Sequence, residues 1–364
     1  MTMTMTMKFT TTNSAFSSLL KNFNELYSKL PTRSISWKWN KPPPTAVQKL
    51  EKLSLSYYSY KPEYLMEKEE VQPKPPIIAL HGLYTSKAYF YDLAASLAMR
   101  LRRQVYLLDL RNHGESPWNS SNSSGVRQQF DGKASLAMLS HDLVHFMDEF
   151  AIPKALLLGY GLGGRAVIQC AQLNEPRIEK LITVDISQDG PYVFSKSLPK
   201  YLNYLKDVDP GSGSSAGGGG DSASLTYVRL VMKEILRGQV KSPVILKFLL
   251  DGIRLDSQGQ YVWRFNARVL EQMLAQWSTV KQIAYCGRQS KAVKVLNVVT
   301  RNNFITSEDY LELRKAYRSC AVEQVVGSGA RLSVPGSSRG GGGGNNNNNK
   351  PTLAKAIEKF AAAP

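Results

Sequence analysis

The chain has 364 residues, 43% of them apolar, which suffices for one large domain or two smaller ones with a sizeable core. No stretch reaches the eighteen or so uninterrupted apolar residues that a membrane-spanning helix needs, and its three cysteines, with no C-x-x-C spacing, indicate neither a disulfide framework nor a zinc site. A net charge of +17 suggests nucleic acid or an anionic membrane as partner, but the excess is unevenly placed and the first fifty residues hold a large share of it.

Those first residues resemble a targeting segment more than a binding patch. A single acid, Glu25, faces the basic residues Lys8, Lys21, Lys29, Arg33, Lys38, Lys41 and Lys49. Apolar residues recur at helical spacing from Phe16 to Leu30, and Pro31 ends the helix. Basic, hydroxyl-rich, acid-poor amphipathic sequence is typical of a mitochondrial presequence, although an ordinary surface helix is the alternative. We expect a presequence and Pro-rich linker over residues 1–45, import into the matrix, and no nucleic-acid partner.

From residue 46 onward, short apolar runs alternate with helical patterns. The expected strands are 53–60, 77–80, 105–109, 155–158, 181–185, 295–300 and 322–326. Such alternation predicts an α/β fold, in which helices cover both faces of a mostly parallel sheet. The run at 53–60 alternates apolar and polar residues, which predicts an antiparallel edge strand. The sheet domain is expected to span residues 46–190 and 291–364.

Residues 191–290, between the two parts of the sheet domain, show a mainly helical pattern and predict an inserted cap. Two low-complexity tracts interrupt the chain, one at Gly211 to Ser222 and one at Gly336 to Asn349. Such sequence offers too little apolar surface to offset the entropy of ordering it. We expect both tracts to be disordered loops.

A glycine-rich corner follows the run at 155–158 and opens a helix. Gly159, Gly161 and Gly164 satisfy G-x-G-x-x-G, and Asp185 ends the next strand, which is the context of a dinucleotide-binding fingerprint. However, such a fingerprint normally belongs to the first strand of its domain, and here at least three strand-like runs come earlier. Nucleotide binding therefore stays as the third of three hypotheses.

Other segments carry a family resemblance. They are H-G-L at 81–83, R-N-H-G-E-S at 111–116, V-D-I-S at 184–187 and Y-V-W-R-F-N at 261–266. Together they resemble the mitochondrial α/β-hydrolases that include the yeast ethanol acetyltransferases, over about residues 53–333. The resemblance implies an α/β-hydrolase fold with an inserted helical cap and a Ser-Asp-His triad.

The resemblance also assigns positions to the triad. The nucleophile position is Gly161, the acid is Asp185, and the base position, in the segment 327–330, is Ala330. The serine and the histidine are therefore missing. The oxyanion donors, backbone N–H groups, are expected from Leu83 and Leu162. His81 and His113 lie in motifs near the site and are expected to hold loops by hydrogen bonds rather than to act as bases.

Glycine is a substitution that such a corner tolerates well. A nucleophile elbow holds its residue in a strained backbone conformation, which glycine adopts without penalty. Ser116 and Ser187 are the nearest substitute hydroxyls, but neither lies between a strand and a helix. His141 and His145 share a helix face, yet no third ligand accompanies them, so no metal and no cofactor are expected.

The sequence thus favours a degenerate α/β-hydrolase that acts by binding. Its ligand is expected to be a small acyl ester, an acyl-CoA-like molecule or a protein partner. The second hypothesis is an active carboxylic ester hydrolase, or an acetyl-CoA-dependent alcohol acyltransferase, with a non-standard site. A family resemblance supports fold strongly and function weakly.

Overall fold

The structure is a computed structural model that describes residues 53–61, 74–118, 132–172, 176–186, 198–213, 224–241, 243–271, 293–299, 319–325 and 352–363. The chain divides into two units, Met1–Thr45 and Ala46–Pro364, and every described residue belongs to the second. Three predicted segments lie outside the described residues: the presequence at 1–45, the part of the first low-complexity tract at 214–222, and the second tract at 336–349.

A seven-stranded sheet forms the centre of the domain. Its strands, in spatial order, are β1 (Tyr57–Tyr60), β3 (Val105–Leu108), β2 (Ile77–Leu80), β4 (Ala155–Tyr160), β5 (Ile178–Val184), β8 (Lys294–Val299) and β9 (Cys320–Gln324). Only the β1–β3 pair is antiparallel among these, and the other pairs are parallel. The predicted mostly parallel sheet with an antiparallel edge strand is confirmed.

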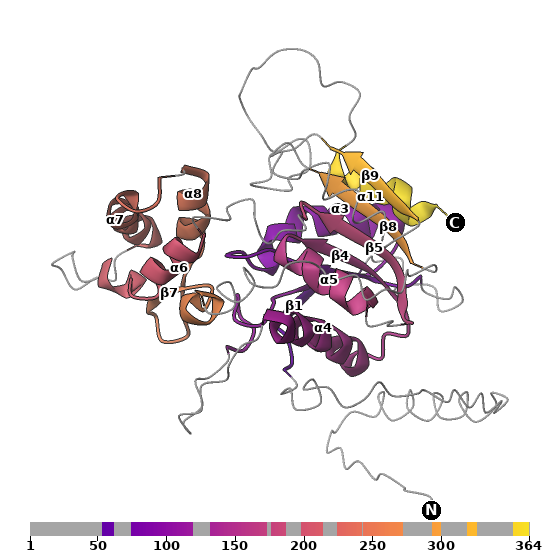
Figure 1. Cartoon of the computed structure of the whole chain (residues 1–364), viewed down its shortest axis with the longest axis horizontal. Helices are drawn as coiled ribbons and strands as arrows, with labels where there is room; N and C mark the ends of the chain where they lie inside the picture. The colour runs from indigo at the N-terminus through magenta and orange to yellow at the C-terminus, as the bar shows by residue number, and fades with distance from the viewer. Residues whose placement is uncertain are drawn as a thin grey trace, which may run out of the picture. The chain divides into compact units, whose positions relative to one another are not determined.

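Alternate residues of each strand serve two separate apolar layers. On one face, Ile77 and Ala79 pack with helices α3 (Tyr91–Leu101) and α11 (Leu353–Ala362). On the other face, Ile78 and Leu80 pack with α4 (Gly132–Glu149) and α5 (Leu162–Gln172). Figure 1 shows α4 and α5 together on one side of the strands. Burial on both faces explains why these strands are continuous apolar runs in the sequence.

The inserted cap contains helices α6 (Leu198–Leu205), α7 (Leu225–Arg237) and α8 (Pro243–Asp251), with a 3-10 helix η4 (Pro210–Gly213). The side chain of Ser224 caps α7 by accepting a hydrogen bond from the Tyr227 N–H. The cap also holds a hairpin of β6 (Ile253–Leu255) and β7 (Tyr261–Trp263), which the mainly helical prediction missed. Three-residue strands are too short to show a period in sequence.

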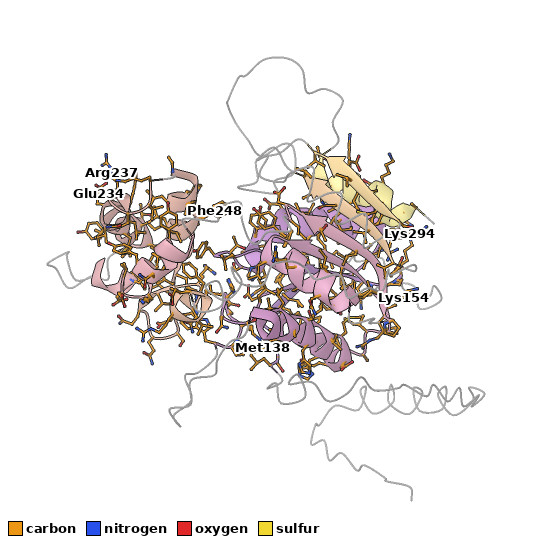
Figure 2. All side chains as sticks on the ribbon, viewed as in Figure 1. Met138, Lys154, Glu234, Arg237, Phe248 and Lys294 are labelled. Atoms are coloured by element: carbon orange, nitrogen blue, oxygen red, sulfur yellow. The ribbon has the colours of Figure 1, made fainter. Side chains whose placement is uncertain are left out.

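Three further predictions need correction. Strand β5 begins at Ile178, earlier than expected, and β9 covers Cys320–Gln324 rather than 322–326. The first residues of the Gly211 tract belong to η4, because Pro210 fixes its own φ and the Asp209 carboxylate accepts a hydrogen bond from the Gly211 N–H at 2.9 Å. Figure 2 shows the described side chains of the sheet domain and of the cap.

Among the described residues, no helix is long and apolar enough to cross a bilayer.

Candidate functional site

The order of the strands creates a topological switch point at the carboxyl ends of the strands. The chain passes from β2 outward to β3 on one side and returns to β4 on the other side of β2. The loops that follow β2 and β4 therefore diverge at the carboxyl ends of the strands, which is where open α/β sheets bind ligands. The H-G-L segment and the glycine corner are these two loops.

Three glycines of the corner leave no room for a side chain. A Cβ on Gly159 would lie 2.5 Å from the Gly163 carbonyl oxygen, and a Cβ on Gly163 would lie 2.2 Å from that of Leu80. A Cβ on Gly164 would lie 2.3 Å from the side chain of Ile186. These glycines allow α5 to approach β2 and β4 closely, so they serve packing rather than contact with a pyrophosphate, which disfavours the nucleotide hypothesis.

Gly161 differs from its neighbours. Its φ is +50°, and an added Cβ would meet only the Gly82 Cα, at an ordinary 3.9 Å. Its N–H donates to the Val184 carbonyl at 3.0 Å, which fixes the corner against the end of β5. The backbone thus has the left-handed conformation expected of a nucleophile elbow, with space for a side chain and no reacting oxygen.

Asp185 lies at the same edge, directly after β5. It has a φ of +50° and is buried, and its N–H donates to the Val298 carbonyl at 3.0 Å. Two tyrosines that the sequence analysis missed lie near this carboxylate. Tyr89 and Tyr160 stack with ring centroids 4.9 Å apart. Burial, then the neighbouring tyrosine and Asp185, raises the pKa of Tyr89, and burial and Asp185 raise that of Tyr160, so both phenols stay protonated.

The two expected oxyanion donors flank a direct contact between the loops. The Gly163 N–H donates to the His81 carbonyl at 3.1 Å, which docks the start of α5 on the turn after β2. Leu162 is the first residue of α5, and Leu83 lies two residues after His81. Among the described residues, neither the Leu83 nor the Leu162 N–H has a backbone acceptor. Backbone N–H groups at a turn and at a helix start are the kind of donor that an oxyanion site uses.

His81 is fully buried and uses both ring nitrogens. Its Nε2 accepts a hydrogen bond from the Leu110 N–H at 3.0 Å, so Nδ1 carries the proton and donates to the Gly82 carbonyl at 2.7 Å. Burial lowers the pKa of His81. With its Nε2 lone pair engaged, this imidazole holds the turn after β2 and accepts no proton from a nucleophile.

His113 is also buried, and its ring lies edge-on to that of His81, with centroids 5.1 Å apart. Nδ1 lies 3.1 Å from the Arg111 carbonyl. Nε2 has no hydrogen-bond partner among the described residues. Burial, then the neighbouring His81, lowers the pKa of His113 to about 3. A group with that pKa is a weak base, so His113 is poorly suited to take a proton from a nucleophile at neutral pH.

The loop after β3 is held by a buried charged cluster that sequence reasoning missed. Asp109 accepts hydrogen bonds from the Lys87 backbone N–H and Nζ, both at 2.6 Å, and from the Glu115 N–H at 2.9 Å. Burial alone would raise the pKa of Asp109, but His81, these N–H donors and Lys87 together lower it. Ser116 donates to the Asp109 carbonyl at 2.6 Å and accepts from the Ser56 N–H at 2.8 Å. Its hydroxyl is structural, not nucleophilic.

The remaining sequence candidates do not form a second site. Asp142, next to His141, pairs with Arg111 through two hydrogen bonds of 2.5 Å. Within the described part of the chain, no group of three or more His, Cys, Asp or Glu side chains is placed to hold a metal ion. Ala330 and Ser187 lie outside the described residues.

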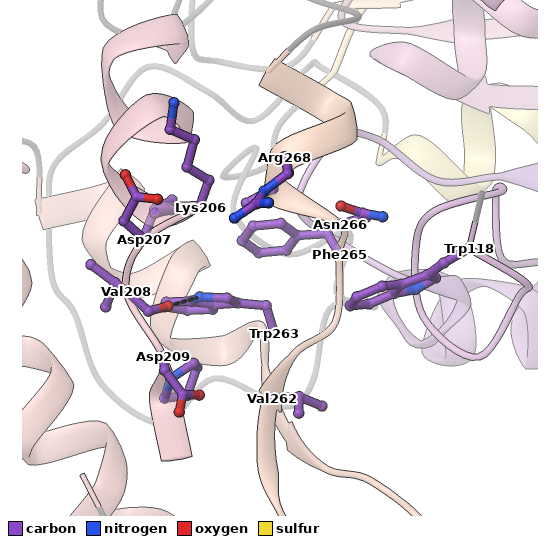
Figure 3. Close-up of a pocket in the computed structure, with 13 residues that line it drawn as sticks. Trp118, Lys206, Asp207, Val208, Asp209, Val262, Trp263, Phe265, Asn266 and Arg268 are labelled. Atoms are coloured by element: carbon purple, nitrogen blue, oxygen red, sulfur yellow. Dashed lines mark hydrogen bonds between the residues drawn. The ribbon is translucent and has the colours of Figure 1, made fainter. Parts of the chain in front are cut away.

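A pocket of about 560 Å³ lies among cap residues and Trp118. Figure 3 shows its aromatic wall, where Trp263 and Phe265 stack with centroids 5.5 Å apart. The Trp263 indole N–H donates to the Val208 carbonyl at 2.8 Å. Phe265 also contacts Tyr84, the residue after Leu83, with ring centroids 5.0 Å apart. One aromatic contact therefore links the pocket wall to the turn after β2.

The sheet order, the glycine corner and the carboxylate that directly follows β5 are features of the α/β-hydrolase fold. A family model described as alpha/beta hydrolase fold matches residues 75–243. A solved structure of a marine microorganism esterase shares the fold, with a TM-score of 0.56 and 21% identity over 77% of this chain and 93% of that one. The chain therefore has the α/β-hydrolase fold, with a mostly parallel sheet flanked by helices.

Its relatives carry names from hydrolysis and acyl transfer. The sn-1-specific diacylglycerol lipase ABHD11 of Xenopus laevis is 28% identical over 70% of this chain and 73% of its own length. A probable alcohol acetyltransferase of Saccharomyces cerevisiae is 31% identical over 44% of this chain and 43% of its own. Esterase YbfF of Escherichia coli is 27% identical over 54% and 63% respectively.

Proposed function

We propose that this protein is a catalytically degenerate α/β-hydrolase that binds a small acyl ester or an acyl-CoA-like ligand without hydrolysing it. The observation that carries the proposal is Gly161, which keeps the backbone of a nucleophile elbow, at a φ of +50°, without an attacking oxygen. Loss of nucleophile and base together lowers a serine hydrolase's rate by roughly 10⁶, or about 8 kcal/mol of transition-state stabilisation.

Neither buried histidine near the corner replaces the base. His81 Nε2 already accepts the Leu110 N–H, and the pKa of His113 is about 3. The substitute hydroxyl of Ser116 is engaged as both donor and acceptor. The described side chains around Gly161 therefore supply no activated nucleophile.

Binding has better support than chemistry. The Leu83 and Leu162 N–H groups suit a carbonyl oxygen, and these donors are backbone atoms that no side-chain loss removes. The pocket beside Phe265 is walled by aromatic rings, as ligand pockets commonly are. The names of the relatives, a lipase, an acetyltransferase and an esterase, indicate ligands that carry an acyl group.

Restoring the triad tests the proposal. Hydrolysis of p-nitrophenyl acetate is compared for wild type, Gly161→Ser, Ala330→His and the double variant. Each single variant is expected to stay at background, because serine needs a base and histidine needs a hydroxyl to activate. The double variant is expected to gain activity, with Asp185 orienting the new imidazole.

A second assay addresses the wild type alone. A fluorophosphonate serine-hydrolase probe is expected to leave the protein unlabelled. Acetyl-CoA and p-nitrophenyl butyrate, added separately, are screened for a rise in melting temperature. Robust wild-type turnover, or covalent labelling, contradicts the proposal, and absence of stabilisation by both probes contradicts acyl-ligand binding.

The proposal includes residence in the mitochondrial matrix. It rests on the basic, acid-poor, amphipathic composition of residues 1–45. We expect import with removal of the first 30 to 40 or so residues. N-terminal sequencing of the endogenous protein checks this, and cytosolic protein that retains Met1 contradicts it.

A further inference from the structure

A second cavity lies at the opposite end of the sheet from Gly161. It has a volume of about 410 Å³ and is lined by Lys74, Arg103, Glu179, Lys180, Lys294 and the last residues of α11, Ala361 to Ala363. These side chains precede or begin strands β2, β3, β5 and β8. Parallel strands thus bring four cations and a single carboxylate to one cavity. Neither the elbow chemistry nor the cap accounts for this gathering.

Two of the cations are buried and fixed. Lys180 donates to the carbonyl oxygens of Phe360 and Ala361, at 3.1 and 3.2 Å, and to that of Ala363. Arg103 donates to both carboxylate oxygens of Glu179, at 3.1 and 3.3 Å, and to the Pro75 carbonyl at 2.8 Å. The buried side of the cavity is therefore preorganised by hydrogen bonds to backbone carbonyls and to the Glu179 carboxylate.

Like charges are held together here by strand register. Lys180 of β5 pairs directly with Lys294 of β8, and residues paired in parallel strands point to the same face. Burial lowers the pKa of Lys180, Glu179 opposes this, and the cations Lys294 and Arg103 lower the pKa further. Like charges placed directly opposite each other destabilise a sheet, and a bound anion relieves their repulsion.

We propose that this cavity binds an anion bearing phosphate groups. Lys74 and Lys294 are exposed and lie where they are able to contact phosphate oxygens, while Lys180 and Arg103 supply fixed positive charge behind them. Lysine ammonium groups bind phosphate as point charges. Lys180 and Asp185 lie at opposite ends of β5, about 17 Å apart at roughly 3.3 Å per residue, so this anion does not compete with a ligand at the corner.

The probe is inorganic pyrophosphate, with the full chain and melting temperature as the readout. Pyrophosphate is expected to raise the melting temperature of wild type in a saturable way, whereas sodium chloride of equal ionic strength does not. The variant Lys74→Gln/Lys294→Gln is expected to bind pyrophosphate about tenfold or more weakly, since a lost charged contact is commonly of that size.

Lys154→Gln is the matched control. Lys154 directly precedes β4, so it lies at the same edge of the sheet; it is exposed and is not among the residues that line the cavity. Figure 2 labels it together with Lys294. This variant loses one charge from the same edge, and its affinity for pyrophosphate is expected to stay within about twofold of wild type.

A vesicle-binding experiment distinguishes a soluble phosphate ligand from a lipid headgroup. Wild type is also sedimented with neutral vesicles and with vesicles that contain phosphatidic acid. Saturable pyrophosphate binding that the double variant loses assigns a soluble ligand, and vesicle binding that it loses assigns a lipid headgroup. Absence of both, or equal binding by wild type, the double variant and Lys154→Gln, overturns the proposal. Retained acyl-ligand binding in the double variant shows that the corner is intact.

Discussion

Two loops meet at the carboxyl edge of the sheet and are held in opposite ways. The corner from Gly159 to Gly164 packs closely because it lacks side chains: three of its glycines lie where a Cβ would collide with neighbouring atoms. The loop from Asp109 to Ser116 is held by side chains, through a buried carboxylate that gathers Lys87 and two backbone N–H groups.

The comparison distinguishes the residues that shape the site from the residue at the nucleophile position. The contacts that shape the two loops involve no side chain at position 161. Gly161 is the one glycine of the corner whose added Cβ meets only an ordinary contact. On the function proposed above, such a site would keep its backbone donors and its shape for a ligand without an attacking oxygen.

The largest effect is expected from Gly163→Ala, which breaks the corner. Its Cβ would lie 2.2 Å from the Leu80 carbonyl oxygen and 2.6 Å from that of His81, both of them backbone atoms. Because β2 has no room to retreat, α5 must shift, at a cost of about 4 kcal/mol or more in free energy of unfolding. Urea denaturation measures the change. A loss under about 1 kcal/mol would mean that the corner is not close-packed.

Lys87→Met is expected to destabilise the loop from Asp109 to Ser116. It leaves the buried Asp109 without its ammonium partner, so the free energy of unfolding is expected to fall by about 3 kcal/mol near neutral pH. The lowered pKa of Asp109 means that its contribution is present above the unfolded-state pKa and is lost as the pH falls through the lower folded value. The deficit of the variant should therefore shrink at acid pH. A constant deficit from pH 7 to pH 3 contradicts the role given to this pair.

Features of the fold and site that depend on neighbouring residues could be predicted from the sequence, whereas contacts between residues far apart in the chain could not. The corner and Asp185 lie where motifs placed them, because each is a local strand-end feature and parallel strands bring such ends together. Lys87 and Asp109 belong to different loops, and nothing in their spacing predicts contact. The stacking of Tyr89 on Tyr160 likewise depends on tertiary packing, and the β6–β7 hairpin is too short to show a period.

His113→Gln sharpens the comparison at intermediate pH. A folded pKa of about 3, against about 6.5 unfolded, keeps this histidine neutral in the native state. Its contribution is complete above the unfolded pKa and is lost as the pH falls toward the folded pKa, by about 2 kcal/mol between pH 7 and pH 5. The variant is expected to lose that part of the pH dependence, while His81 keeps its own. Denaturation curves at both pH values measure it, and an unchanged slope contradicts a buried neutral His113.

The smallest effect is expected from Gly161→Ala, the partner of Gly163→Ala. Each change adds one methyl group, and the two positions flank Leu162. The Cβ at position 161, however, would meet only the Gly82 Cα, at 3.9 Å. The expected cost is about 1 kcal/mol, which comes from placing a non-glycine residue at a φ of +50° and not from collision. Urea denaturation of the two variants side by side separates conformational strain from steric overlap. If Gly161→Ala is as damaging as Gly163→Ala, the corner has no space for a side chain at the nucleophile position. Restoring serine there would then fail for reasons of folding, and the glycine would be a packing requirement rather than the mark of a lost reaction.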